Sequence, residues 1–494
     1  MNYKMIGRFS AQMLAIEAVF MLPAFLICLL DQTEKRSQSL ITANAFLASI
    51  LIMAAVAGVL FLFSRKATKD FYATEGMVSV SVGWLLMSLL GCLPFCLSGE
   101  FPSYIDAFFE MVSGFTTTGS SVMKNVEGLT NGVLYWRSFS NWLGGMGVLV
   151  FLLALVPAGG QNKGFTMHLL RAESPGPDVG KLTPKMRTTA MALYLIYIIM
   201  TVICFIFLVF DPKMSFFEAV CTAFSTAGTG GFGIKNDSFA SFSPYVQIVC
   251  TVFMLLFGVN FSCYYLLLLG KIKSVLKDEE LRLYGVIVFG SIALITLNIY
   301  NKIDSMTNVG DALRHSAFQV ASIISTCGFA SADFDMWPTF SKAILLLLMV
   351  TGACAGSTAG GLKCARVLLL FKSLRRNIAQ VLKPQEVQTV RINGRPMDER
   401  ILANTNTYLV AYVIILVISF LVVSLDNFSP MTNFSAVLSC FNNIGPGLEA
   451  VGPSCTFKDY SILSKIVLCL DMLAGRLEIF PILALFSFKA YRKG

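Results

Sequence analysis

Ten long apolar runs are the feature that most limits how this chain can fold. Each run has about 18 residues or more, which is the length that an α-helix needs to cross the hydrocarbon core of a bilayer. We therefore predict an all-α polytopic membrane protein. The runs lie at 9–30, 41–63, 76–97, 133–156, 190–210, 245–269, 283–300, 343–370, 408–425 and 462–488.

The composition agrees with a bilayer environment. Hydrophobic residues make up 55% of the 494 residues, charged residues make up 14%, and the mean hydropathy is +0.70, whereas ordinary soluble chains are about 25% charged. The run at 9–30 follows Lys4 and Arg8, as the core of a signal peptide would. It is too long for one and has no small-residue cleavage site, so we interpret it as a spanning helix.

Residue types that catalyse reactions or bind transition metals are dispersed along the chain. The 13 cysteines form no CxxC pair and fall mostly inside apolar runs, where cysteine behaves as a small buried hydrophobe. The two histidines are His168 and His315, so a histidine metal cluster or a Ser/His/Asp triad would need distant coincidences. We expect no enzyme activity and no cofactor in this chain.

The distribution of charge predicts the orientation of the chain. With the N-terminus in the cytoplasm, the predicted spans place most Lys and Arg residues on the inner side and a smaller excess of Asp and Glu on the outer side. This is the positive-inside pattern, and the opposite orientation would reverse it. We therefore expect both termini to be cytoplasmic.

Four shorter apolar stretches lie between the later spans, at 103–116, 215–227, 311–325 and 432–442. Each is about one third to one half of a spanning length, which indicates a re-entrant half-helix. A run rich in Gly and small polar residues overlaps or follows each one; in isolation, such a run is usually a surface turn. These runs are SGFTTTGSS (113–121), FSTAGTGGFG (224–233), SIISTCGFAS (322–331) and CFNNIGPGLE (440–449).

The repetition of this pattern argues against four ordinary turns. All four runs face the outer side, and the last eight spans divide into four copies of one unit: helix, half-helix, glycine run, helix. Bare backbone at membrane depth is tolerated only where protein buries it or where it lines water. We therefore predict two N-terminal transmembrane helices followed by four helix, re-entrant pore loop, helix repeats around a pseudo-fourfold central pore.

These residue types suit the passage of a dehydrated monovalent cation. Converging backbone carbonyls supply uncharged oxygen ligands, glycine permits the backbone angles that align them, and each half-helix aims its negative C-terminal end at the centre. Outer acids, including Glu110, Asp311, Asp333 and Glu449, would raise the local cation concentration, although a merely solvated rim is as good an interpretation of any single one.

An ordered series of motifs resembles the TrkH-type subunit of the Trk/Ktr/HKT family of potassium transporters over nearly the whole chain. The resemblance implies potassium uptake across the bacterial inner membrane through a gated, channel-like pore. The matching stretches are SGFTTTGSSV, WRSFSNWLGGMGVLV (136–150), HLLRAESPGP (168–177), STAGTGGF, ADFDMWP (332–338), GACAGSTAGGLK (352–363), NNIGPGLEAVGP (442–453) and MLAGRLEIFP (472–481).

The resemblance also implies which residues form the potassium selectivity filter. A central glycine in all four repeats goes with potassium preference in this family, and a serine in the first goes with sodium permeation. In the second repeat Gly228 or Gly230 remains an alternative to Gly231 as the central residue, and Cys327 and Ser120 depart from the usual Thr and Ala. The filter residues are Thr117, Thr118, Gly119 and Ser120; Thr229, Gly230, Gly231 and Phe232; Thr326, Cys327, Gly328 and Phe329; and Asn443, Ile444, Gly445 and Pro446.

The eighth span is interrupted by GACAGSTAGG at 352–361. Each interior glycine disfavours a helix by about 1 kcal/mol relative to alanine, although small residues also serve close helix packing. The resemblance implies an intramembrane gating loop here, below the filter. The gating residues are Gly352, Gly356, Ser357, Thr358, Gly360 and Gly361, together with Arg476.

Three charged residues fall inside or near the ends of spans, where charge is expensive. The resemblance places Arg476 in the permeation path as a barrier, and a salt bridge to Glu478 or Asp471 is the alternative. Arg137 is close enough to a span end to snorkel to the surface. We can name no partner for Glu17.

The basic segments 159–189 and 363–400 predict the cytoplasmic face. Topology and attraction to anionic lipid account for many of these charges. The resemblance adds a homodimer and a regulatory ring of TrkA-type nucleotide-binding subunits. The sequence has no phosphate loop and no dinucleotide fingerprint, so ATP, ADP or NAD would bind to that partner, and we expect no binding to nucleic acid.

The repeats give five expected regions: 1–70 for the N-terminal helices, 71–160 for the first repeat, 161–275 for the second with its preceding cytoplasmic loop, 276–375 for the third with the gating loop, and 376–494 for the fourth. Two functional alternatives remain: a symporter that couples potassium to protons or sodium, and a sodium-permeable variant.

Overall fold

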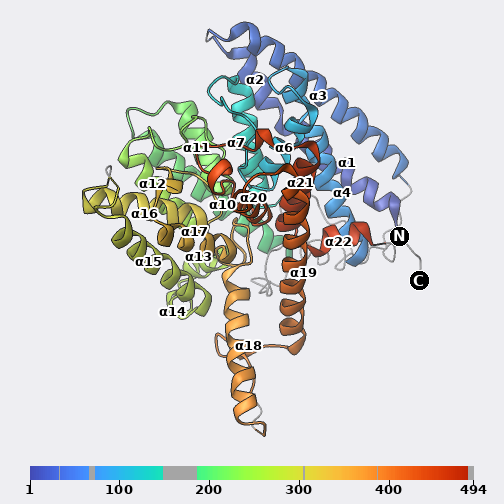
Figure 1. The fold of residues 1–494 in the computed structure, drawn as a ribbon. Coiled ribbons are helices and arrows are strands. Elements are labelled where there is room, and N and C mark those ends of the chain that lie inside the picture. The colour runs from blue at the N-terminus through green and yellow to red at the C-terminus, as the bar shows by residue number, and fades with distance from the viewer. Residues whose placement is uncertain (33, 66–72, 148–185, 304–305, 386–387, 488–494) are drawn as a thin grey trace.

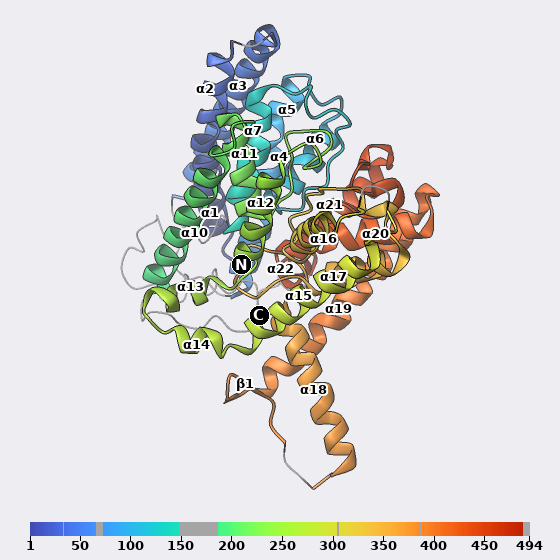
Figure 2. The ribbon, with the colours of Figure 1, turned by 90° about the vertical axis from the view of Figure 1, so that its left-hand side faces the viewer.

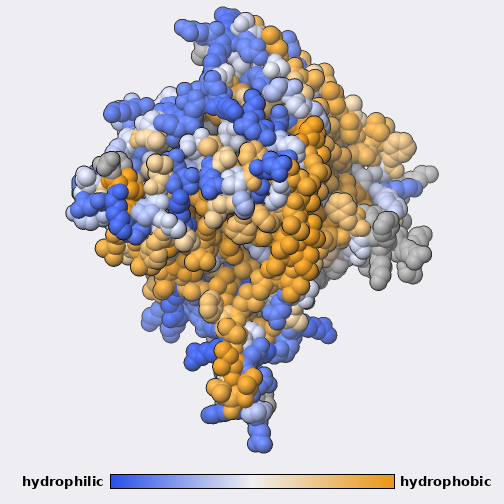
Figure 3. All heavy atoms as spheres, viewed as in Figure 1, coloured by the Kyte–Doolittle hydropathy of each residue, from blue (hydrophilic) through white to orange (hydrophobic). Residues whose placement is uncertain are grey.

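The computed structural model describes residues 1–494 except 33, 66–72, 148–185, 304–305, 386–387 and 488–494. Within this part, six helices are long and apolar enough to cross a membrane, and a seventh candidate is bent by 88°. Exposed apolar side chains form a broad band with hydrophilic surface on either side of it (Figure 3). The chain is therefore a multi-pass, mostly helical membrane protein (Figures 1 and 2).

The N-terminal helices pack on one side of the molecule. The first predicted span is divided at Met21, ahead of Pro23, into α1 (Tyr3–Phe20) and α2 (Leu22–Leu30), and both pack against α3 (Arg36–Phe63). Proline breaks the helical hydrogen bonding at this point. Glu17 of α1 is buried, and both of its carboxylate oxygens lack a hydrogen-bond partner among the described residues.

The rest of the chain repeats one order of elements four times: a long helix, a short helix, a glycine-containing segment and a second helix. The first set is α4 (Ala73–Gly91), α6 (Tyr104–Phe115) and α7 (Asn131–Gly145); the second is α10 (Met186–Val209), α11 (Phe216–Gly228) and α12 (Pro244–Phe257); the third is α15 (Glu279–Ile299), α16 (Val309–Ile324) and α17 (Thr339–Thr351); the fourth is α19 (Glu399–Val423), α20 (Pro430–Phe441) and α21 (Ile462–Arg476).

The four short helices α6, α11, α16 and α20 correspond to the predicted half-helices. Each begins after a residue whose side chain accepts a hydrogen bond from a backbone N–H of the first turn, which is how Ser and Asn cap helix N-termini. Ser215 and Glu218 form a complete capping box on α11. The capping residues are Ser103, Ser215, Asn308 and Ser429.

The second helix of each set is shorter than the sequence predicted. These helices have 15, 14, 13 and 15 residues, although we expected continuous spans at 133–156, 245–269, 343–370 and 462–488. The continuation of the first beyond residue 147 lies outside the described residues. Each helix ends near glycine: Gly144 lies against the carbonyl of Phe115 and Gly475 against that of Phe441, where a Cβ would overlap the oxygen.

Each set of helices packs against the next set along the chain, and the fourth set packs against the first. Helix α7 packs against α11, α12 against α16, α17 against α20, and α21 returns to pack against α6. The short helix of one set is therefore held by the second helix of the previous set. This closed order brings the four glycine-containing segments together.

The remaining elements are short, apart from α18 (Cys364–Leu382), which projects beyond the rest of the molecule (Figures 1 and 2). They are α5 (Leu93–Leu97), α13 (Phe261–Leu268), α14 (Ile272–Leu276), α22 (Phe480–Phe486), an antiparallel pair of β1 (Arg391–Ile392) and β2 (Arg395–Pro396), and the 3₁₀ turns η1 (Phe334–Met336), η2 (Ser424–Asp426), η3 (Glu449–Val451) and η4 (Phe457–Asp459).

Candidate functional site

The four glycine-containing segments share one backbone conformation. In each, a Thr or Asn adopts a positive φ, the next residue does not, and the glycine after it does again. Glycine takes this conformation readily, whereas the side chain of a Thr or Asn makes it unfavourable. The pairs are Thr117 (56°) and Gly119 (81°), Thr229 (50°) and Gly231 (71°), Thr326 (58°) and Gly328 (87°), and Asn443 (55°) and Gly445 (104°).

A common hydrogen bond links each segment to its short helix. The backbone N–H of the residue between the two positive-φ positions donates to the carbonyl of a serine five residues earlier, at 2.8–3.0 Å. This correspondence aligns Gly231, rather than Gly228 or Gly230, with the glycines of the other segments. The serines are Ser113, Ser225, Ser322 and Ser439, and their recurrence in the sequence was a signal of register that we did not use.

Each of the four glycines lies against a carbonyl oxygen of another segment. A Cβ on Gly119 would lie 2.5 Å from the oxygen of Gly230, and one on Gly445 would lie 2.7 Å from the oxygen of Thr118. At Gly231 and Gly328 the Cβ would overlap the oxygens of Cys327 and Ile444. The contacts run from the first segment to the second, third, fourth and back to the first, so the segments form a closed ring.

Side chains next to the glycines join the segments laterally. The hydroxyl of Ser120 donates to the carbonyl of Gly445 at 3.1 Å, and Asn443 donates from Nδ2 to the hydroxyl of Thr118 at 3.0 Å. The ring of Phe329 packs on Phe239 at 4.4 Å between centroids. These contacts link the fourth segment to the first and pack the third segment against the chain that follows the second.

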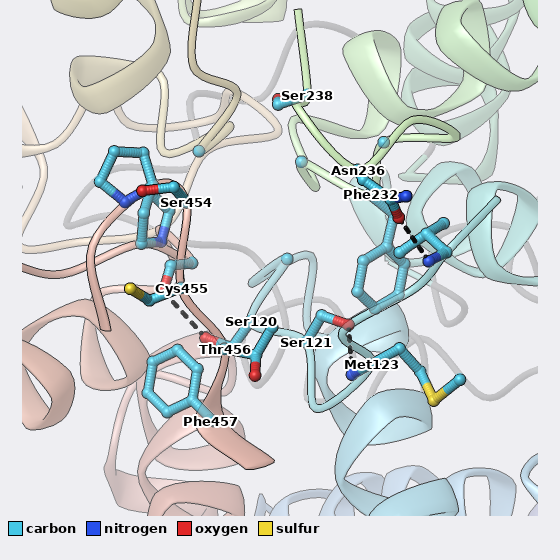
Figure 4. Close-up of a pocket in the computed structure, with 18 of the residues that line it drawn as sticks. Ser120, Ser121, Met123, Phe232, Asn236, Ser238, Ser454, Cys455, Thr456 and Phe457 are labelled. Carbon is cyan, nitrogen blue, oxygen red and sulfur yellow. Dashed lines mark hydrogen bonds between the residues drawn. The ribbon is translucent and has the colours of Figure 1, made fainter. Parts of the chain in front are cut away.

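A cavity of about 120 Å³ lies on one side of this ring. Its lining includes all four glycines, Phe232, Pro446 and the segment Ser454–Phe457, and Figure 4 shows several of these side chains around it. Ser120, Ser121, Lys124 and Arg137 also line it. All four central glycines therefore border one cavity on this side of the ring.

Glu110 and Arg137 form a buried ion pair, which corrects two expectations from the sequence. Glu110 does not belong to a solvated rim, and Arg137 does not reach the surface, because their side chains are 0% and 2% exposed and lie 2.6 Å apart. Glu110 also accepts from the N–H of Val122 at 3.0 Å. Arg137 stacks on Phe232 at 4.3 Å, so the pair connects the first segment to the second.

The other predicted outer acids lie in short-range polar contacts. Asp311 pairs with Arg314 at 2.9 Å, and Asp333 accepts from the hydroxyl of Ser454 at 2.9 Å. The carboxylate of Glu449 accepts hydrogen bonds from the hydroxyls of Ser429 and Thr432. These bonds favour the charged form and lower the pKa of Glu449 from its usual value of 4.5.

Residues 352–363 form an irregular segment between α17 and α18, as the glycines in GACAGSTAGG indicated. Gly352, Gly356 and Gly361 have positive φ values, and the chain doubles back so that Gly352 meets Gly361. The N–H of Gly360 donates to the hydroxyl of Thr326 at 2.7 Å. The segment is thus held directly beneath the ring of glycines, on the side opposite the cavity.

Three further contacts fix this segment. The hydroxyl of Thr358 receives a hydrogen bond from that of Thr229 at 3.3 Å, and the hydroxyl of Ser357 donates to the carbonyl of Cys354 at 2.6 Å. Glu280, which was not among the residues predicted from the sequence, accepts a hydrogen bond from the N–H of Ala355 at 2.6 Å.

Arg476 ends α21 and points under the same ring. Its guanidinium donates to the carbonyl of Thr358 at 2.8 Å, to the carbonyls of Gly144 and Gly145, and to the hydroxyl of Thr117 at 3.3 Å. The carbonyls at the C-terminal end of α7 carry partial negative charge, which suits the partly buried guanidinium. The arginine therefore joins the 352–363 segment, α7 and the first glycine-containing segment.

Comparisons with known proteins match nearly the whole chain. A family model described as TrkH, cation transport protein, matches residues 42–491. The Trk system potassium uptake protein TrkH of Escherichia coli (strain K12) is 34% identical over 454 residues, which cover 90% of this chain and 91% of that protein. The protein of the same name from Halomonas elongata is 32% identical and matches over 100% of both chains.

A solved structure agrees with these sequence matches. The crystal structure of the potassium transporter TrkH from Vibrio parahaemolyticus aligns over 100% of both chains with a TM-score of 0.87 and 30% sequence identity. Fold and sequence therefore agree over the full length. The chain belongs to the TrkH family of cation transport proteins.

Proposed function

We propose that this protein takes up potassium across the bacterial inner membrane through a gated, potassium-selective pore. The four sets of helices are its four pore repeats, and the pore follows their pseudo-fourfold axis. The observation that carries the proposal is that each central glycine lies against a backbone carbonyl of the next segment, and that the fourth segment returns to the first. Related proteins named as potassium uptake proteins support potassium as the transported ion.

The ring explains how a cation could leave its water shell. Each central glycine lies against a backbone carbonyl oxygen of the next segment, and a side chain at any of the four positions would collide with that oxygen. Such oxygens replace water ligands without adding net charge. The short helices add the partial negative charge of their C-terminal ends, which lie immediately before the segments. Gly119, Gly231, Gly328 and Gly445 thus form the centre of the filter.

The 352–363 segment and Arg476 act as the gate. Their hydrogen-bond donors occupy hydroxyls at the inner end of the filter: Arg476 bonds to Thr117 and the N–H of Gly360 bonds to Thr326. An ion at this level would need the same oxygens, so the donors and the ion exclude each other. The guanidinium also repels an approaching cation. Opening requires Arg476 and Gly360 to withdraw.

The protein operates as a homodimer with cytoplasmic termini, together with a cytoplasmic nucleotide-binding ring of the TrkA type. Relatives named as members of a Trk system support the existence of other components. The projecting helix α18 carries Arg375 and is followed by Lys383, and these residues offer a basic surface for such a partner. ATP, ADP or NAD would bind to the partner, and this chain supplies the path for potassium.

Ion flux into liposomes tests the proposal. The purified chain is reconstituted, and rubidium and sodium uptake are measured side by side, with and without gradients of protons and sodium. We expect passive rubidium flux down its own gradient and much slower sodium flux. Rubidium uptake that appears only with a proton or sodium gradient would instead indicate a symporter, and equal sodium flux would indicate a sodium-permeable variant.

A further inference from the structure

A partly buried ion pair joins the projecting helix α18 to the break that follows Arg476. Arg366 lies in the first turn of α18, and Glu478 lies between α21 and α22. The two side chains form a salt bridge and are only 9% and 16% exposed. Arg366 also stacks on the ring of Tyr408 of α19, with 3.9 Å from its guanidinium carbon to the ring centroid. Removing one partner of such a pair leaves an uncompensated charge, so the contact resists separation.

The backbone on both sides of this pair is in an unfavourable conformation. Glu478 and Ile479 have φ values of 60° and 65°, and Lys363, which precedes α18, has a φ of 73°. A β-branched residue such as Ile479 is a clear outlier in this region. Strained conformations persist only where surrounding contacts hold them, and they gather at sites that change shape. Here the holding contacts include the Arg366–Glu478 pair.

The pair closes a circuit of contacts around the proposed gate. Arg476 bonds to the carbonyl of Thr358 at 2.8 Å, and Lys363 donates from Nζ to the carbonyl of Ala359. The chain then runs from Lys363 to Arg366, which pairs with Glu478, two residues beyond Arg476. Every link in this circuit is either a covalent bond or a buried or partly buried polar contact. A displacement of the start of α18 therefore also displaces the turn at Glu478 and Ile479, which sets the position of the Arg476 side chain.

We infer that Arg366 and Glu478 are positioning residues that hold Arg476 in the closed gate and couple it to the orientation of α18. Helix α18 projects from the molecule and is the part on which a cytoplasmic partner could act (Figures 1 and 2). A displacement of this helix breaks or shifts the ion pair, relaxes the turn at Glu478 and Ile479, and withdraws Arg476 from the filter. The inference rests on the proposed role of Arg476 as a barrier.

A double-mutant cycle of rubidium flux in liposomes tests the inference. The four proteins are the parent, Glu478→Gln, Arg476→Ala and the double variant. We expect Glu478→Gln to raise flux about fivefold or more, the low end of coupling between linked sites, and to have no further effect once Arg476 is alanine. Equal effects in both backgrounds would overturn the inference, because Glu478 would then act independently of Arg476.

The same experiment separates failure of the inference from failure of the proposed gate. Unchanged flux in Arg476→Ala would reject the gate itself, whereas raised flux there with no effect of Glu478→Gln would reject only the coupling. Arg366→Gln breaks the pair from the other helix and should match Glu478→Gln, and Arg366→Lys keeps the charge and should stay near the parent flux. Should one glutamine variant misfold on gel filtration, the other decides the question.

A second ion pair on α18 provides the matched control. Arg376 pairs with Glu399 farther along the helix, where Glu399 is 71% exposed. Arg376→Gln removes a charge and an ion pair from the same helix, but it does not touch the circuit around Arg476. We expect its flux to equal that of the parent. An increase as large as that of Glu478→Gln would show that flux depends on the charge of α18 rather than on the Arg366–Glu478 ion pair. This result would overturn the inference.

Discussion

The guanidinium of Arg476 lies 3.3 Å from the hydroxyl of Thr117, and the N–H of Gly360 lies 2.7 Å from the hydroxyl of the equivalent Thr326. Two donors from separate parts of the chain thus occupy corresponding oxygens in two of the four segments. In the fourth segment, Oδ1 of Asn443 is buried and has no hydrogen-bond partner among the described residues. The proposed gate and a permeating ion would therefore compete for one set of side-chain oxygens.

This competition predicts that potassium loosens the 352–363 segment. Hydrogen exchange of peptides covering Gly360 should be faster in potassium than in a large organic cation that cannot enter the filter, because each ion bound at the threonine level displaces the N–H of Gly360. Lithium, which fits a ring of carbonyls poorly, is the control and should resemble the organic cation. Identical exchange in all three solutions would contradict the competition.

Alanine substitutions at the four central glycines should have graded effects. At Gly231 and Gly328 a Cβ overlaps a carbonyl oxygen of the neighbouring segment, whereas at Gly119 and Gly445 the distances are 2.5 and 2.7 Å. All four positions also have positive φ, which disfavours alanine by about 1 kcal/mol or more. Rubidium flux should therefore fall at all four positions, and most strongly in Gly231→Ala and Gly328→Ala.

Gly233 supplies the control for this series. It is two residues from Gly231, has no positive φ, and a Cβ there would meet its nearest neighbour at an ordinary 3.5 Å. Gly233→Ala should keep parent flux and expression. Equal loss of flux at Gly233 and Gly231 would mean that general stability, rather than the approach of carbonyls, explains the effect.

The short helices and the interrupted eighth span could be predicted from the sequence, because their signals are local. Cap residues such as Ser215, the length of each apolar stretch and the glycines of 352–361 are visible in windows of a few residues. The breaks after Phe257 and Arg476 were not predicted, because we continued each span through the polar residues Asn260, Arg476 and Glu478 into the apolar residues beyond them. Hydropathy detects burial in apolar surroundings, and a buried loop has the same signature as a buried helix.

The partners of buried charges could not be predicted with the same certainty. Glu110 and Arg137 are 27 residues apart and meet only because α6 packs on α7. A usable signal was present: two opposite charges, each inside an apolar segment of one repeat, are expected to pair. No such signal marks Arg366 and Glu478, which are separated by 112 residues and meet across two breaks in helices.

The Glu110–Arg137 pair should be essential for stability. Both side chains are buried, and removing one leaves the other charge uncompensated, which typically costs about 3–5 kcal/mol. Arg137→Gln and Glu110→Gln should each lower the thermal unfolding temperature in detergent strongly. The exposed pair Lys124–Asp459 is the control, since Lys124→Gln should change stability by about 1 kcal/mol at most. Similar losses for both pairs would contradict the importance of burial.

Glu449 should contribute stability in a pH-dependent way. Its pKa is lowered from 4.5 in the folded protein by hydrogen bonds from Ser429 and Thr432, so the folded state releases its proton more readily than the unfolded chain. A group with a depressed pKa stabilises the fold above its unfolded pKa, and this contribution disappears as the pH falls through the folded value. Glu449→Gln should therefore unfold at a lower temperature than the parent at pH 7, and the difference should shrink below pH 4.5.

Ser429→Ala, which removes one of the donors, should reduce the same difference. A gap between Glu449→Gln and the parent that stays constant from pH 7 to acid would show that the carboxylate charge does not supply this stability.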